Sequence, residues 1–232
     1  MEKNNVSNAC KAMESLLVGG FPSGLISLLY GVASTGKTSL AMQCAVNRAR
    51  AGEKVIFIDG DNAFSIKRLA QIAGDDIKYI SDSIFLFTPS SFYEQSSLIE
   101  NLDRYMSKPI SLIIVDTITS LYRLELTSSQ SAFMLNRELN RQLAYLASIC
   151  KKNNVAIVVI SGVHAILDET EKTAEVEPVA KRVLNFWSSI TIKLERCPDS
   201  QFRKAIFEKH FEPQLKNSEC LFRLTDNGLL TF

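Results

Sequence analysis

The stretch Gly31-Val32-Ala33-Ser34-Thr35-Gly36-Lys37-Thr38 matches the phosphate-binding pattern GxxxxGK[ST]. The apolar run 25–30 before it has the length of a buried strand, and residues 39–45 after it have helical character. A Gly-rich turn without function is the competing interpretation, and the strand, loop and helix order disfavours it. The stretch therefore predicts an α/β fold built around a phosphate site.

The residue types of this stretch suit a nucleoside triphosphate. Gly31 and Gly36 permit backbone conformations that turn successive N–H groups toward phosphate oxygens. Lys37 offers a point charge to the β- and γ-phosphates, and the Thr38 hydroxyl is a ligand for Mg²⁺. The predicted nucleotide contacts are Gly31, Ser34, Thr35, Gly36, Lys37, Thr38 and Ser39.

Length and composition predict one globular core. The chain has 232 residues, of which 46% are hydrophobic and 22% charged. We expect a short lead-in over residues 1–24 and a single domain over 25–232. The formal net charge of +1 gives no global electrostatic case for nucleic acid, so such a contact must come from a local patch.

The cysteines and the N-terminus predict a soluble cytoplasmic protein without a membrane partner. The five cysteines are far apart and include no CxxC pair, which favours reduced thiols over disulfides or a zinc site. No apolar run approaches the roughly 18 residues that span a membrane, and no signal core follows Met1. With only two histidines, the chain offers no serine-hydrolase or thiol-protease constellation.

Apolar runs along the chain predict the remaining elements. Buried strands are expected at 54–59, 83–87, 110–116 and 155–160, and helices at 38–51, 91–106 and 129–152. Shorter alternating runs predict antiparallel strands that extend the sheet at 189–194, 202–209 and 221–224. The segment 121–126 is expected to be a surface loop. The charged face of helix 129–152 is interpreted as a solvated face rather than a DNA contact.

Carboxylates follow two of these strands. Asp116 ends the strand 110–116, where it can hold Mg²⁺ through water opposite Thr38. Asp59 and Asp61 lie at the end of the strand 54–59, at the edge where open α/β sheets bind ligands. A carboxylate there positions an attacking water or forms an Asx-type turn, and residue chemistry leaves both interpretations open.

Two later segments bear on phosphate or DNA contact: His164 has two possible roles, and the acidic residues that follow disfavour DNA. His164 senses the γ-phosphate or forms a hydrogen bond within its own loop, and the second role is favoured. Residues 168–177 are acidic and would repel a phosphate backbone.

The order of these motifs resembles the RecA/RadA recombinase superfamily, and most closely the RadB paralogues of archaea. The similarity covers essentially the whole chain. The stretches that carry it are Gly20–Thr38, Phe57–Asp61, Phe87–Phe92, Leu121–Leu126, Arg141–Leu143 and Phe186–Arg196. The last three are more discriminating than the phosphate loop, which many ATPases share.

The resemblance implies a RecA-like P-loop ATPase core, with a mostly parallel sheet flanked by helices and C-terminal antiparallel strands. It also implies ATP and Mg²⁺ as ligands, and weak hydrolysis in an accessory protein of homologous recombination and DNA repair, a mediator or regulator. DNA, with the single-stranded form favoured, and a recombinase or other repair proteins are the implied partners. It places Asp61 and Lys37 in catalytic positions, Thr38 and Asp116 on the metal, and Arg68 near the adenine. The loops after Asp116 and Ser161 would face DNA.

Three departures from the family pattern favour ATP binding over rapid turnover. The catalytic glutamate falls on Asp61, whose side chain is one methylene shorter. The usual Asn-Gln after the fifth strand is replaced around Gly162-Val163, and the Gly-Gly of the second DNA loop falls on Ala180-Lys181. Two alternatives remain open: a KaiC-like signalling ATPase that acts through protein partners without DNA, and a nucleotide-stabilised scaffold that never hydrolyses ATP.

Overall fold

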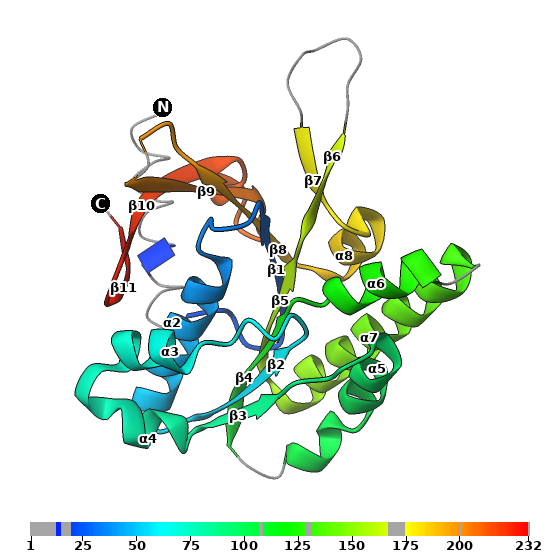
Figure 1. Cartoon of the computed structure of the whole chain (residues 1–232), viewed down its shortest axis with the longest axis horizontal. Coiled ribbons are helices and arrows are strands. Elements are labelled where there is room, and N and C mark those ends of the chain that lie inside the picture. The colour runs from blue at the N-terminus through cyan, green and yellow to red at the C-terminus, as the bar shows by residue number, and fades with distance from the viewer. Residues whose placement is uncertain are drawn as a thin grey trace.

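The computed structural model describes residues 13–14, 20–106, 109–128, 131–166, 175–199 and 201–231. A sheet of nine strands runs through this part of the chain in the order β11-β10-β9-β8-β1-β5-β4-β2-β3, and helices lie on both of its faces (Figure 1). Most of the lead-in 1–24, Cys10 included, and residues 168–174 of the acidic segment lie outside the described residues.

Five strands form the parallel half of the sheet, and they confirm the predicted buried runs. They are β1 (Ile26–Gly31), β2 (Lys54–Asp59), β3 (Ile84–Phe87), β4 (Ile110–Asp116) and β5 (Ala156–Ser161). Helices cover both faces of these strands, so β1, β2, β4 and β5 are apolar at nearly every position instead of at alternate positions.

The C-terminal strands extend the sheet beyond β1. They are β8 (Ile190–Arg196), β9 (Phe202–Lys209), β10 (Ser218–Thr225) and β11 (Gly228–Thr231). The predicted antiparallel pairing of the C-terminal strands is confirmed from β8 to β11, and β8 joins the parallel half of the sheet by running parallel to β1. The crossover helix α8 (Lys181–Trp187) returns the chain so that β8 runs in the direction of β1.

The helices bury two separate cores, one on each face of the sheet. Three of them pack on one face: α2 (Lys37–Arg50), α3 (Ile66–Ala73) and α4 (Ile77–Ser81), with the short 3-10 turn η1 (Gly74–Asp76) joining the last two. Four pack on the other: α5 (Phe92–Glu100), α6 (Ser120–Ser128), α7 (Ala132–Asn153) and α8. Figure 1 shows this division, with α2, α3 and α4 on one side of the sheet and α5, α6 and α7 on the other.

Three sequence predictions about this second face need correction. The segment 121–126 is helical and not a loop, because the Thr117 hydroxyl accepts a hydrogen bond from the Ser120 N–H at 3.1 Å and Tyr122 packs against Phe92 in the core. The helix expected over 91–106 divides into α5 and the 3-10 turn η2 (Leu102–Tyr105). His164 lies in a strand and not in a loop, because β6 (Val163–Ile166) pairs with β7 (Glu175–Pro178).

No helix in the described ranges is both long and apolar enough to cross a membrane.

Candidate functional site

The loop between β1 and α2 has a tightly turned backbone that its own residues hold in place. Ser34 and Gly36 have left-handed backbones with φ of 62° and 99°, and the Thr35 hydroxyl donates to the Val32 carbonyl at 2.9 Å. Gly31 is required because a Cβ there would lie 2.2 Å from the Leu194 carbonyl oxygen of β8. The predicted residues Gly31 to Gly36 therefore form one compact turn at the carboxyl edge of the parallel strands, and Lys37 and Thr38 begin α2.

The Lys37 side chain reaches into this turn. Its Nζ donates to the carbonyl oxygens of Gly31 at 2.8 Å and Val32 at 2.9 Å. Burial lowers the pKa of the ammonium, and the nearby carboxylates of Asp116 and Asp61 oppose that shift. Phosphate oxygens are better partners for an ammonium than these carbonyls, so the side chain is placed to exchange one set of acceptors for the other.

Thr38 and Asp116 are brought together as predicted. Burial raises the pKa of Asp116 to about 6, and a hydrogen bond from the Thr38 hydroxyl opposes the rise. Both residues offer oxygen donors, which suit a hard cation such as Mg²⁺. Two side-chain oxygens do not complete the six ligands of Mg²⁺, and in Mg²⁺–nucleotide complexes phosphates and water supply the others. The donor set fits a Mg²⁺–nucleotide complex rather than a protein cage.

The two carboxylates after β2 have different roles. Asp59 is 2% exposed and accepts the backbone N–H groups of Asp61, Ala63 and Phe64 at 3.2, 3.1 and 2.8 Å. It holds the turn, as the Asx interpretation of this segment predicts. Asp61 is exposed and lines a cavity of about 470 Å³ with Ser90, Ser120 and Arg123. Of the pair, Asp61 is the exposed carboxylate, and the cavity that it lines does not include the residues around Lys37.

Arg68 lies beside the start of α2, and its guanidinium is held in one orientation. It donates to the carbonyl oxygens of Thr225 and Asp226 at 2.8 Å each, and its Nε approaches Ser39 Oγ at 3.4 Å. A fixed guanidinium plane suits stacking on an aromatic base. Contact with the adenine stays a prediction.

Two arginines that sequence patterns missed lie against the phosphate loop. Arg196 at the end of β8 donates to the Ala33 carbonyl at 2.6 Å, and Arg203 on β9 donates to the Ser34 carbonyl at 3.4 Å. Arg203 also lines a cavity of about 350 Å³ with Lys37, Thr38 and other loop residues. Arg196 ends a stretch that carries the family resemblance, but no sequence pattern places either arginine at the loop, because only the pairing of β8 with β1 and β9 brings them there.

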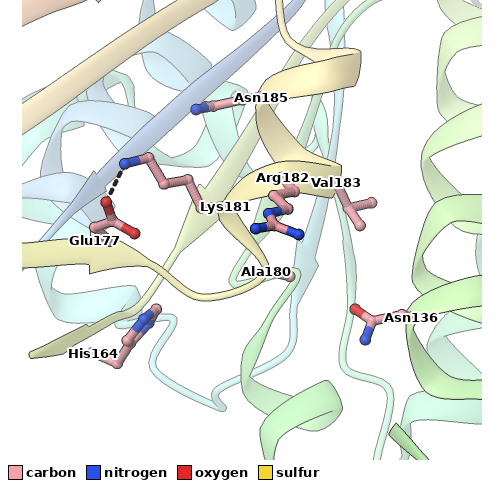
Figure 2. A pocket seen from close by; sticks show the side chains of 8 residues that line it. All are labelled: Asn136, His164, Glu177, Ala180, Lys181, Arg182, Val183 and Asn185. Atoms are coloured by element: carbon pink, nitrogen blue, oxygen red, sulfur yellow. Dashed lines mark hydrogen bonds and ion pairs between the residues drawn. The ribbon is translucent and has the colours of Figure 1, made fainter. Parts of the chain in front are cut away.

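A third cavity, of about 590 Å³, lies between the β6–β7 hairpin, α7 and α8. Figure 2 shows Lys181 paired with Glu177 there, with His164 and Arg182 nearby. Its lining residues are Asn136, His164, Glu177, Ala180, Lys181, Arg182, Val183 and Asn185. His164 thus belongs to this cavity and not to the residues around Lys37. The segment after Ser161 thus gives this cavity a polar lining, in which Glu177 neutralises the charge of Lys181.

The basic face of α7 is ion-paired in the structure. Arg141 pairs with Glu100 and Glu138, and Lys152 pairs with Asp103. This arrangement agrees with the interpretation of that face as solvated surface.

Comparison with known proteins identifies the family. The family model described as Rad51 matches residues 2–231. A "DNA repair and recombination protein RadB" of Thermococcus kodakarensis is 34% identical and covers 97% of this chain and 98% of its own length. The protein of the same name from Methanococcoides burtonii is 31% identical, with 98% of each chain covered.

A solved structure supports the same assignment. The "Crystal structure of the RadB recombinase" superposes with a TM-score of 0.77 at 35% sequence identity, over 94% of this chain and 96% of that one. The predicted RecA-like fold is thereby confirmed. The chain belongs to the Rad51 family, and it resembles members of that family named RadB along nearly its entire length.

Proposed function

We propose that this chain is an ATP- and Mg²⁺-binding, DNA-associated accessory protein of homologous recombination and DNA repair, a mediator or regulator with weak ATP hydrolysis. The observation that carries the proposal is the preformed loop with Lys37 inside it and the Thr38–Asp116 pair beside it. The near full-length similarity to proteins named for DNA repair and recombination supports the biological setting. Residues 25–232 are taken as one core, because its sheet draws strands from Ile26 to Thr231.

Each residue of the site has a distinct task in this proposal. The loop N–H groups and Lys37 bind and orient the phosphates, and Thr38 and Asp116 hold the cation that neutralises their charge. Asp61 accepts the proton of, or orients, the attacking water. Its carboxylate stands one methylene nearer its backbone than a glutamate would, so water is placed less well for in-line attack and turnover is slow.

DNA association is assigned to the face formed by the loops after Asp116 and Ser161. Lys181 and Arg182 are exposed there, next to the hairpin cavity. Since the whole chain carries a net charge of +1, DNA contact depends on such local cations. Single-stranded DNA is the favoured form, and a recombinase or another repair protein is the expected protein partner.

ATP turnover of the wild type and of Asp61→Glu, each with and without single-stranded DNA, tests the catalytic part. Slow wild-type hydrolysis that rises in Asp61→Glu is expected, because the longer side chain reaches the water. Brisk, DNA-stimulated wild-type hydrolysis that the substitution leaves unchanged would refute the assignment. Binding of ATP without any binding of DNA at low salt would instead favour a KaiC-like signalling role.

A further inference from the structure

Two glutamine side chains are buried together beneath the nucleotide site. Gln95 on α5 is 0% exposed and Gln142 on α7 is 1% exposed. Gln95 Nε2 donates to Gln142 Oε1 at 2.8 Å, and Gln142 Nε2 donates to Ser96 Oγ at 2.8 Å. Buried amides cost free energy unless they are hydrogen-bonded, so this pairing fixes the arrangement of both side chains.

Gln95 contacts the two loops that carry Asp61 and Asp116. Its Nε2 also donates at 3.3 Å to the carbonyl of Ile118, two residues after Asp116. A Cβ built on Gly60 would lie 3.2 Å from Gln95 Oε1, so the backbone that precedes Asp61 runs directly against the amide. The Gly60 N–H donates in turn to the Asp116 carbonyl at 2.9 Å, which links the two loops to each other.

The side-chain carbonyl oxygen of Gln95 lacks the hydrogen bond that a buried acceptor normally has. Gln95 Oε1 is buried, and no donor in the described part of the chain reaches it. A buried acceptor without a donor lowers the stability of the fold by about 1–3 kcal/mol. The N–H groups of Gly60 and Asp61 now donate to the Asp116 carbonyl at 2.9 Å and to Asp59 Oδ1 at 3.2 Å, so a shift of this backbone would exchange one of these acceptors for Gln95 Oε1. The pair is therefore placed to respond to a change in the loop that carries Asp61.

Helix α7 extends from this pair to the opposite cavity. Toward its N-terminus, Asn140 Oδ1 accepts the Trp187 Nε1–H at 2.8 Å, and Asn136 Oδ1 accepts the Tyr122 hydroxyl at 3.1 Å. Asn136 also lines the cavity shown in Figure 2. Helix α7 thus reaches the loops after β2 and β4 through Gln142 and its partner Gln95 on α5, and at its other end it contacts α6 and the hairpin cavity through Asn136 and α8 through Asn140.

We propose that Gln95 is a positioning residue for the Asp61 and Asp116 loops, and that the Gln95–Gln142 pair transmits the nucleotide state of the site to α7. Nucleotide at the phosphate loop changes the Gly60–Asp61 backbone, Gln95 follows it, and Gln142 carries the change into the helix. This rests on the proposed function, since it requires a nucleotide bound at Gly31 to Thr38.

Hydrogen–deuterium exchange tests this route without requiring hydrolysis. The wild type and the double variant Gln95→Leu/Gln142→Leu are compared with and without Mg²⁺ and a non-hydrolysable ATP analogue. Leucine at both positions removes the amide pair without leaving either glutamine unpaired, so the fold is expected to survive. The matched control is Gln214→Leu, which changes an exposed glutamine in the 3-10 turn η3 (Pro213–Leu215).

The expected result separates binding from transmission. Nucleotide should slow exchange at residues 31–38 in all three proteins. It should change exchange at residues 132–142 by about fivefold in the wild type and the control, and leave the double variant unchanged there. If the double variant does not fold, Gln142→Met replaces it, with the same expected loss of the α7 response.

Each contrary outcome has its own meaning. Protection at residues 31–38 without any response of α7 in the wild type would overturn this inference and leave the proposed function standing. A full α7 response in the leucine or methionine variant would overturn it as well. Absence of protection at residues 31–38 in the wild type would instead refute the nucleotide binding on which both proposals rest.

Discussion

At the scale of single residues, the structure separates groups that sequence chemistry leaves equivalent. Asp59 and Asp61 are two positions apart with the same side chain, yet one caps a turn through three backbone N–H groups and the other faces a cavity. The difference depends on the path of the backbone after β2, which no residue preference encodes. Arg196 and Arg203 illustrate the same limit, because their relation to the loop is purely tertiary.

Arg203→Gln is predicted to weaken ATP binding. The guanidinium lines the cavity beside Lys37 and adds positive charge where the phosphates would lie. Charge-assisted hydrogen bonds contribute about 1.5–3 kcal/mol, so the Kd for Mg²⁺–ATP should rise about tenfold, and the effect on AMP should be smaller. Isothermal titration calorimetry measures both ligands.

Two further variants serve as controls for the affinity measurement. Lys37→Ala should abolish ATP binding, whereas Arg223→Gln changes an arginine of β10 that does not line the cavity and should keep wild-type affinity. Equal affinities for the wild type and Arg203→Gln would show that Arg203 braces the loop without contacting nucleotide.

Cys44 is predicted to make the fold sensitive to alkali. Burial raises the pKa of its thiol from 9.0 to about 12. The unfolded chain releases this proton near pH 9 and the native chain does not, so raising the pH stabilises the unfolded state. Between pH 9 and 11 the group should therefore remove about 1.4 kcal/mol of stability per pH unit.

Urea unfolding of the wild type and Cys44→Ala across that range measures this contribution. The variant should show the shallower decline in the free energy of unfolding. Parallel declines would contradict the assignment of the effect to this thiol.

At the scale of elements, periodicity predicted the strands and the long helices well, because continuous apolar runs such as 110–116 are unmistakable in a covered parallel sheet. It failed at α6, where two buried residues, Leu121 and Tyr122, are followed by exposed Arg123 and Leu124, so that no helical period is visible. The signal for the start of this helix is a single capping group, the Thr117 hydroxyl. Periodicity made no prediction of the direction of β8 relative to β1, because strand direction depends on the crossover helix and not on the strand's own residues.

Gly31→Ala is predicted to strain the junction of β1 with β8. The new Cβ would lie 2.2 Å from the Leu194 carbonyl oxygen, so the two strands must separate locally. Thermal or urea unfolding should show a loss of at least about 2 kcal/mol. Gly162→Ala is the control, since its Cβ would meet nothing nearer than the Arg123 guanidinium at 3.8 Å, and its stability should stay near that of the wild type. Equal stability of the two variants would contradict the close approach.

At the scale of the whole molecule, the phosphate loop lies between two parts of the structure that the central sheet holds together. The C-terminal strands β8 to β11 bring Arg196, Arg203 and the carbonyls that hold Arg68 to one side of the loop. On the other side, Gln95 of α5 contacts the loops after β2 and β4 and bonds Gln142 of α7, and α7 lines the hairpin cavity through Asn136. The motifs in the sequence predicted the loop Gly31 to Thr38 and the proximity of Thr38 to Asp116, and nucleotide contact by these residues stays a prediction, whereas this connectivity appears only when the chain is folded.

DNA binding measured in three nucleotide states tests the central claim most directly. Fluorescence anisotropy of labelled single-stranded DNA is recorded with Mg²⁺–ATP, with Mg²⁺–ADP and without nucleotide, at increasing salt. The account predicts binding that weakens as salt rises and that differs between the ATP state and the other two. Absence of DNA binding in every state at low salt, with ATP bound, would contradict it.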